Sequence, residues 1–204
     1  MRYKTVLLLL LMIVPAMLWS QDMTTAVTYN TAFPVGNLAG FTSEMSWRGL
    51  GLEFRDMKGQ NMAFGFQTGW NVFSELAEHQ TIEFDNAAIS GTNVRSVNVF
   101  PILLNGDYFV GNKGEVRPFL GISTGMYYIS RQFDIGTVSF FEDHWHFGLA
   151  PEGGFWVPVD RRTFIVFTTR YNVAFSTGDT YLKQDNNQYS YWGFNIGFGY
   201  SYDL

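Results

Sequence analysis

The last stretch of the chain, residues 190–202, alternates from Trp192 onward between large and small side chains. Aromatic and aliphatic residues occupy the even positions from Trp192 to Tyr202, and glycine, asparagine and serine occupy the odd positions between them. A repeat of two is typical of a β-strand. Half-buried strands of soluble proteins usually carry charged or long side chains on their polar face. Glycine on that face favours a strand whose large side chains meet lipid and whose small side chains line a crowded barrel.

The composition agrees with this pattern and excludes several kinds of site. Aromatic residues make up 18% of the 204-residue chain, and charged residues make up 15%, below the roughly 25% of soluble domains. The chain contains 21 glycines and no cysteine. We therefore expect one domain without a disulfide framework, a zinc–thiolate site or a lipid-modified cysteine.

The N-terminus has the pattern of a secretory signal peptide. Arg2 and Lys4 precede an apolar run of about nine residues, which is shorter than the roughly 20 that a spanning helix needs. We expect cleavage after Ser20, so that residues 1–20 form the signal and residues 21–204 the mature domain. Removing two of 13 basic residues leaves 11 against 18 acidic ones, and this net charge of −7 argues against a nucleic-acid partner. No later apolar run reaches spanning length, so a mature chain that enters a membrane must do so as a closed barrel.

The rest of the chain divides into about eight alternating segments. Each has about the 9–11 residues, or slightly more, that a tilted strand needs to cross a membrane. The fourth segment has the weakest alternation, and Pro101 within it suggests a bulge because proline cannot donate to a ladder. The expected strands cover residues 26–34, 46–56, 62–73, 95–110, 117–130, 144–157, 163–174 and 190–202.

The connections between these segments alternate in length. Three are tight and rich in turn-forming residues, at 58–61, 111–115 and 159–162. The other four are long, at 35–45, 74–94, 131–143 and 175–189. This asymmetry predicts an all-β, closed, antiparallel up-and-down transmembrane barrel, with short periplasmic turns and long extracellular loops.

The C-terminal segment carries the most specific motif. Asn195, Gly197, Tyr200 and Tyr202 fit the pattern polar-x-Gly-x-x-aromatic-x-aromatic. With this motif the mature chain resembles the small outer-membrane β-barrel, or porin-family, proteins of Gram-negative bacteria, in which the barrel-assembly machinery reads such a signal. Many of those proteins end on an aromatic residue, whereas here two further residues follow. The resemblance implies export through a cleaved signal, an outer-membrane location, and contact with outer-membrane lipid and with the assembly machinery.

Four charged residues are expected inside the barrel. Glu53, Arg55, Glu152 and Arg170 lie on the small-residue face of their segments, and Glu152 and Arg170 lie on neighbouring strands where they can pair. Breaking a buried ion pair costs about 3–5 kcal/mol, so these charges must be matched. About eight strands enclose only enough room for side chains. The pattern favours a structural plug, and the alternative is a gate or polar path for small solutes.

Two further patterns are weak signals for chemistry. Residues 121–125 match the G-x-S-x-G pattern of serine hydrolases, but no helix follows, so Ser123 is interpreted as a small lumen-facing residue. His144 and His146 share one face and can share a metal, but a third ligand is not evident. We therefore assign no catalytic residue, no cofactor and no metal site.

Aromatic residues near both ends of the segments are expected to form interfacial girdles. They are Trp70, Tyr128, Trp145, Tyr171, Tyr191 and Trp192 on the loop side, and Phe54, Tyr108, Tyr200 and Tyr202 on the turn side.

The sequence predicts an integral outer-membrane barrel with a structural or surface-interaction role and a plugged lumen, and not an enzyme. The alternatives are a narrow pore, a lipid-modifying outer-membrane enzyme that uses His144 and His146, and a soluble ligand-binding barrel. A soluble barrel would place Phe194, Ile196 and Phe198 inside, whereas a membrane barrel places them outside.

Overall fold

The computed structural model describes residues 22–84, 87–135, 138–175 and 188–202. The expected signal peptide lies outside the described residues. Within these ranges the chain forms eight strands and one short helix. Their bounds are β1 Met23–Val35, α2 Asn37–Phe41, β2 Arg48–Lys58, β3 Met62–Phe84, β4 Ala87–Phe109, β5 Arg117–Ile135, β6 Val138–Pro158, β7 Thr163–Ala174 and β8 Tyr189–Ser201.

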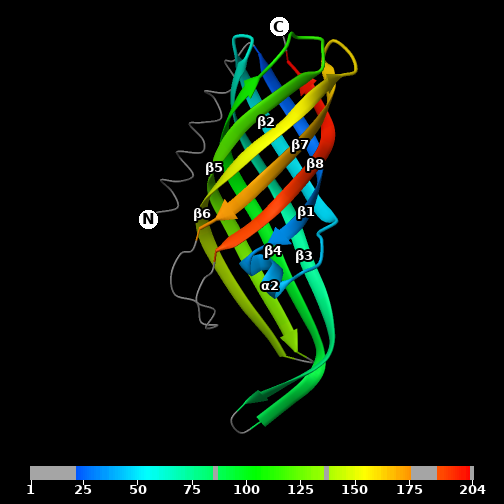
Figure 1. Ribbon diagram of the computed structural model, residues 1–204, viewed down its shortest axis with the longest axis vertical. Coiled ribbons are helices and arrows are strands. Elements are labelled where there is room, and N and C mark those ends of the chain that lie inside the picture. The colour runs from blue at the N-terminus through cyan, green and yellow to red at the C-terminus, as the bar shows by residue number, and fades with distance from the viewer. Residues whose placement is uncertain (1–21, 85–86, 136–137, 176–187, 203–204) are drawn as a thin grey trace.

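The eight strands form a closed barrel in which each strand pairs with its neighbours in the chain (Figure 1). Every pairing is antiparallel, and β8 closes the barrel against β1, from Thr24 opposite Ser201 to Val35 opposite Ser190. Closure leaves no unpaired sheet edge. The all-β, closed, up-and-down fold is therefore confirmed.

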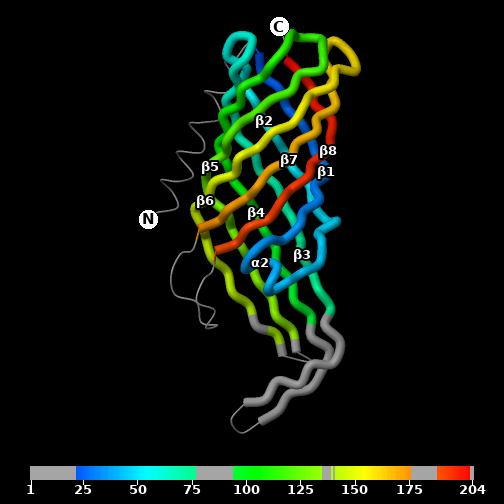
Figure 2. Tube along the Cα trace, in the orientation of Figure 1, coloured from blue at the N-terminus to red at the C-terminus, as the bar shows by residue number. Residues whose placement is uncertain are grey.

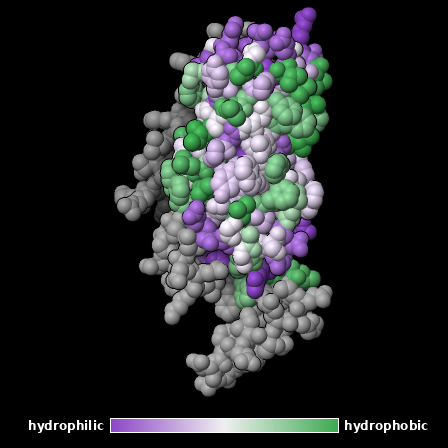
Figure 3. All heavy atoms as spheres, viewed as in Figure 1, coloured by the Kyte–Doolittle hydropathy of each residue, from purple (hydrophilic) through white to green (hydrophobic). Residues whose placement is uncertain are grey.

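The direction of the side chains follows the alternation in the sequence. On β8, Phe194, Ile196 and Phe198 are exposed, the last with 68% of its surface accessible, while Gly193 and Asn195 are buried. Figure 3 shows hydrophobic residues over the outer wall and hydrophilic ones gathered at the end with the tight turns. The parity expected of a membrane barrel is confirmed, because the bulky apolar side chains point outward.

The tight turns lie together at one end of the barrel, as expected, but two of the four expected long loops are shorter than predicted. The tight links after β2, β4 and β6 lie at one end of the barrel, together with the ends of β1 and β8 (Figure 2). Two of the expected long loops, 74–94 and 131–143, are largely strand, since Phe84 pairs with Ala87 and Ile135 with Val138. Backbone hydrogen bonds extend these hairpins beyond the segments that alternate clearly.

Pro101 causes no bulge. The β3–β4 register is the same on both sides of it, with Thr68 opposite Ile102 and Asn71 opposite Val99. Pro101 lies on the buried face, and its carbonyl accepts a hydrogen bond of 2.9 Å from the Thr68 hydroxyl. The missing backbone donor is thus tolerated without an extra residue in the strand.

The helix α2 lies in the connection between β1 and β2. Its five residues include Leu38 and Phe41, both buried. No helix in the described part of the chain is long and apolar enough to cross a membrane.

Candidate functional site

The interior of the barrel is filled by three layers of side chains. The layer at the turn side is apolar and mostly aromatic. Trp156 lies at its centre, with its ring 4.6 Å from that of Phe109 and 4.2 Å from that of Phe164. Met57 and Phe119 belong to the same cluster. This layer fills the barrel immediately inside the tight turns.

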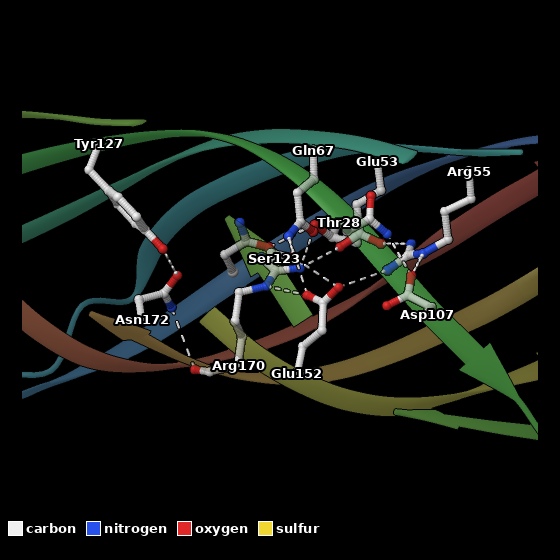
Figure 4. A network of polar contacts seen from close by, with 12 residues as sticks. Thr28, Glu53, Arg55, Gln67, Asp107, Ser123, Tyr127, Glu152, Arg170 and Asn172 are labelled. Atoms are coloured by element: carbon white, nitrogen blue, oxygen red, sulfur yellow. Dashed lines mark hydrogen bonds and ion pairs between the residues drawn. The ribbon is translucent and has the colours of Figure 1, made fainter. Parts of the chain in front are cut away.

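The middle layer is charged, and Arg55 on β2 holds one half of it. Its Nε atom donates to the Asp107 carboxylate at 2.7 Å, its Nη1 atom donates to Glu53, and its Nη2 atom lies 3.8 Å from Glu152 (Figure 4). The Arg55 side chain is 2% exposed. Three carboxylates therefore surround one buried guanidinium.

Arg170 on β7 holds the other half of the charged layer. Its Nε atom donates to Glu152 at 2.5 Å, and its Nη2 atom lies 3.3 Å from Glu53 and donates to Gln67. The Ser123 hydroxyl donates to Glu152 at 3.1 Å. Because Glu53 and Glu152 each contact both arginines, the layer is one connected network drawn from six strands, β2 to β7 (Figure 4).

The layer at the loop side is apolar, and α2 completes it. Leu38 and Phe41 pack in one cluster with Val97 and Ile129. The Arg131 guanidinium lies 4.2 Å from the centroid of the Phe41 ring, a favourable cation–π arrangement. The helix therefore contributes side chains that cover the charged layer from the loop side.

The space left inside these layers is small. A polar cavity of about 20 Å³ lies between Asn30, Gln67, Arg170 and Tyr191. One water needs about 10–15 Å³, so this cavity holds about one water molecule. The geometry suits a rigid packed interior better than a solute path.

The structure brings the four expected lumenal residues together. Glu53, Arg55, Glu152 and Arg170 are all buried, and Glu152 and Arg170 lie opposite each other in the β6–β7 register. Sequence reasoning did not single out Asp107. It lies on the buried face of β4. The odd-numbered residues of that segment point inward, so the position of Asp107 in the sequence could have predicted its place in the lumen.

Gln67 was also missed as a member of the network. Its amide donates to the Ser123 hydroxyl and, at 3.3 Å, to Glu152. Nothing in the local sequence distinguishes it from other inward polar residues, since its partners come from β5, β6 and β7.

Ser123 and the two histidines each contact a neighbouring polar group. Ser123 lies within β5 and is fully buried, as expected for a lumen-facing serine. His144 contacts Glu142 at 3.1 Å, and the Nδ1 atom of His146 lies 2.9 Å from the Phe175 carbonyl oxygen. Among the described residues no three histidine, aspartate or glutamate side chains gather as metal ligands would.

Nine of the ten expected girdle residues have outward positions, and one does not. Stacked or tilted pairs lie on the outer wall, such as Trp70 with Phe100 and Tyr171 with Trp192. Tyr191 is the exception, since it is buried and packs against Phe73 with ring centroids 5.5 Å apart. Its odd position places it on the inward face of β8, and this corrects its assignment to the girdle.

The residues of the expected assembly signal lie on both faces of β8. Asn195 and Gly197 are buried, while Tyr200 and Tyr202 are exposed with ring centroids 5.0 Å apart. A Cβ atom at Gly197 would come 2.0 Å from the Val27 carbonyl oxygen, so β8 and β1 approach closely at this point.

Comparison with known proteins relates this architecture to solved structures. No protein-family model and no curated protein sequence matches the chain. Neisserial surface protein A is 13% identical, with 91% of this chain and 98% of that chain covered and a TM-score of 0.56. Outer membrane protein OprG from Pseudomonas aeruginosa is 17% identical, with 91% and 97% covered and a TM-score of 0.52. Ail, the attachment invasion locus protein of Yersinia pestis, in complex with a heparin analogue, is 10% identical, with 88% and 96% covered and a TM-score of 0.50.

These likenesses concern the fold. The chain has the fold of the eight-stranded outer-membrane β-barrels, and the match extends over nearly the whole length of both chains.

Proposed function

We propose that the protein is an integral outer-membrane barrel with a structural or surface-interaction role and a non-conducting lumen. The observation that carries this proposal is the distribution of side chains on the closed barrel. Large apolar residues such as Leu120 and Phe198 point outward, and an ionic network of two arginines and three carboxylates fills the centre. Lipid is the environment that such an outer surface needs.

Subcellular fractionation tests the location. A chain exported through residues 1–20 and inserted in the outer membrane should remain with the membrane pellet after lysis and require detergent for extraction. Recovery of the folded barrel in a detergent-free supernatant would contradict the proposal.

Conductance measurements test the closed lumen. The purified barrel in a planar bilayer should show no stable channels, because two apolar layers flank the charged layer. Stable single-channel steps would favour the alternative of a narrow pore for small solutes.

The enzyme alternative depends on His144 and His146. Replacing both by alanine should leave the outer-membrane lipid profile unchanged if the role is structural. A changed profile in a normally assembled double variant would favour a lipid-modifying enzyme.

The proposed partner during biogenesis is the barrel-assembly machinery. The aromatic pair Tyr200 and Tyr202 lies exposed at the end of β8, where a partner can reach it. Tyr202→Ala should slow assembly in cells more than refolding of the pure protein into detergent, since only the first needs recognition. Tyr108→Ala, at another exposed turn-side tyrosine, is the matched control.

A further inference from the structure

A second cavity lies at the turn-side mouth of the barrel, outside the charged layer. It has a volume of about 110 Å³, and its floor is formed by Met57, Trp156 and Phe164. Since one water needs about 10–15 Å³, the cavity has room for a group of several heavy atoms. The three floor residues are buried inside the barrel, so the cavity opens along the barrel axis and not toward lipid.

Arg117 at the start of β5 lines this cavity and is 5% exposed. One of its terminal nitrogens donates to the Gln60 carbonyl, and its guanidinium lies 5.0 Å from the centroid of the Phe109 ring. Among the described residues its Nε atom has no hydrogen-bond partner, and no carboxylate lies within 4.0 Å of the guanidinium. A buried cation without a counter-ion is costly, so a negative group at this place would be stabilising.

Trp156 supplies a second donor without an acceptor. It lies directly opposite Arg117 in the β5–β6 register, and its indole Nε1 atom has no partner among the described residues. Two adjacent residues on the wall of one cavity thus each leave a buried N–H unsatisfied. A group that satisfies both must be an acceptor, and a negatively charged acceptor would also supply the counter-ion that the Arg117 guanidinium lacks.

The remaining charges around the cavity favour an anion. Lys113 is paired with Asp22, at 3.1 Å from each carboxylate oxygen. The other charged lining residues are Arg117, Arg161 and Arg162 against Glu115 and Asp160. With Lys113 and Asp22 offsetting each other, the described lining residues therefore carry a net charge of +1, whereas the chain as a whole is acidic.

We propose that the turn-side mouth is a binding site for a small soluble anion that carries a phosphate group. The fork of the Arg117 guanidinium matches the oxygens of phosphate, the Trp156 indole adds a third donor, and the apolar floor accepts a ring or a short carbon chain. The site faces the periplasm if the orientation under the proposed function holds. Binding itself does not depend on that orientation.

Nuclear magnetic resonance of the folded barrel in phosphatidylcholine nanodiscs tests the site. Titration with phenyl phosphate should shift the Trp156 indole N–H and the Arg117 Nε–H signals, whereas sodium chloride of equal ionic strength should not. Arg117→Gln should weaken binding by about tenfold or more, since it removes a charge-assisted contact. Arg161→Gln should weaken it by a few fold, and Lys58→Gln, a basic residue near the same end but outside the cavity, should leave it unchanged.

Three outcomes would overturn the proposal. The first is that phenyl phosphate shifts neither signal in the unmodified protein, which decides the question even if Arg117→Gln does not fold. The second is equal affinity in the wild-type protein and the Arg117 and Arg161 variants. The third is a shift only in nanodiscs that contain phosphatidylglycerol, because that result assigns the site to a lipid headgroup. A barrel that conducts, or that fractionates elsewhere, would contradict the proposed function and leave this result intact.

Discussion

Arg170 is the side chain on which the strands of the barrel centre converge. It contacts Glu152 from β6, Glu53 from β2 and Gln67 from β3. Each of these partners is itself buried, so bulk water cannot replace Arg170 as its hydrogen-bond donor. A buried network of this kind is stabilising only while every member keeps its partners.

Removing Arg170 should therefore be costly. We expect Arg170→Met to lower the free energy of unfolding by about 3–5 kcal/mol, because Glu53 and Glu152 lose a shared counter-ion. Urea unfolding in detergent micelles, followed by the heat-dependent shift in electrophoretic mobility, measures this change. Lys58→Met removes an exposed ion pair with Asp56 and should cost at most about 1 kcal/mol. Similar losses in both variants would contradict a central role for the network.

Gly121 leaves the room that the charged layer needs. A Cβ atom there would lie 1.9 Å from an Asp107 carboxylate oxygen and 2.8 Å from the Gly106 carbonyl oxygen. We expect Gly121→Ala to destabilise the barrel by about 1–3 kcal/mol through overpacking.

Gly106→Ala is the matched control, since an added Cβ meets only the Phe64 ring at an ordinary 3.6 Å. The same urea measurement compares the two variants. An alanine at 121 that is tolerated as well as one at 106 would show that Asp107 is free to move.

The helix α2 is the element that closes the loop side of the barrel. It contacts β1 and β8, and its two buried side chains reach the apolar cluster over the charged layer. Five residues are too few for a helix that is stable by itself, so its conformation depends on this packing.

Truncating Phe41 should therefore release the helix. We expect Phe41→Ala to cost about 3–5 kcal/mol and to speed hydrogen exchange of the α2 amides, since the ring that packs on Arg131 is removed. Gly40→Ala, whose Cβ would meet nothing within 4 Å, should leave both quantities unchanged or improved. Unchanged exchange in Phe41→Ala would show that the backbone alone holds α2 in place.

The whole molecule is a barrel with the polar groups inside and the apolar groups outside. On β8 the outer face runs from Trp192 near the loop side, through Ile196, to Tyr200 near the turn side. This order places Ile196 near the middle of the apolar band. A charge at that depth has no polar partner on the lipid side.

A charge placed on this face should discriminate a membrane barrel from a soluble one. Ile196→Arg should cost about 2–4 kcal/mol for folding into phospholipid vesicles, whereas Val110→Arg, beyond the turn-side end of β4, should cost about 0–1 kcal/mol. Equal yields of folded protein for the two variants would argue against a lipid-facing Ile196.

The limits of sequence reasoning are visible in particular segments. The alternation of large and small residues correctly predicted the strands, the outward face of β8 and the inward positions of Glu152 and Arg170. It did not predict the strand residues from Ser74 onward or from Arg131 onward, because backbone hydrogen bonds pair these hairpins where the sequence does not alternate. It did not predict α2, whose conformation depends on residues from β3, β4 and β5.

The sequence by itself determined which face of the wall each side chain takes, because a strand repeats every two residues. Only the tertiary structure decided which inward charges meet. Glu53 and Arg170 are 117 residues apart in the chain and come together because the sheet closes on itself. The β5–β6 register, also a feature of the tertiary structure, set Arg117 and Trp156 side by side at the mouth, each with an unsatisfied donor among the described residues.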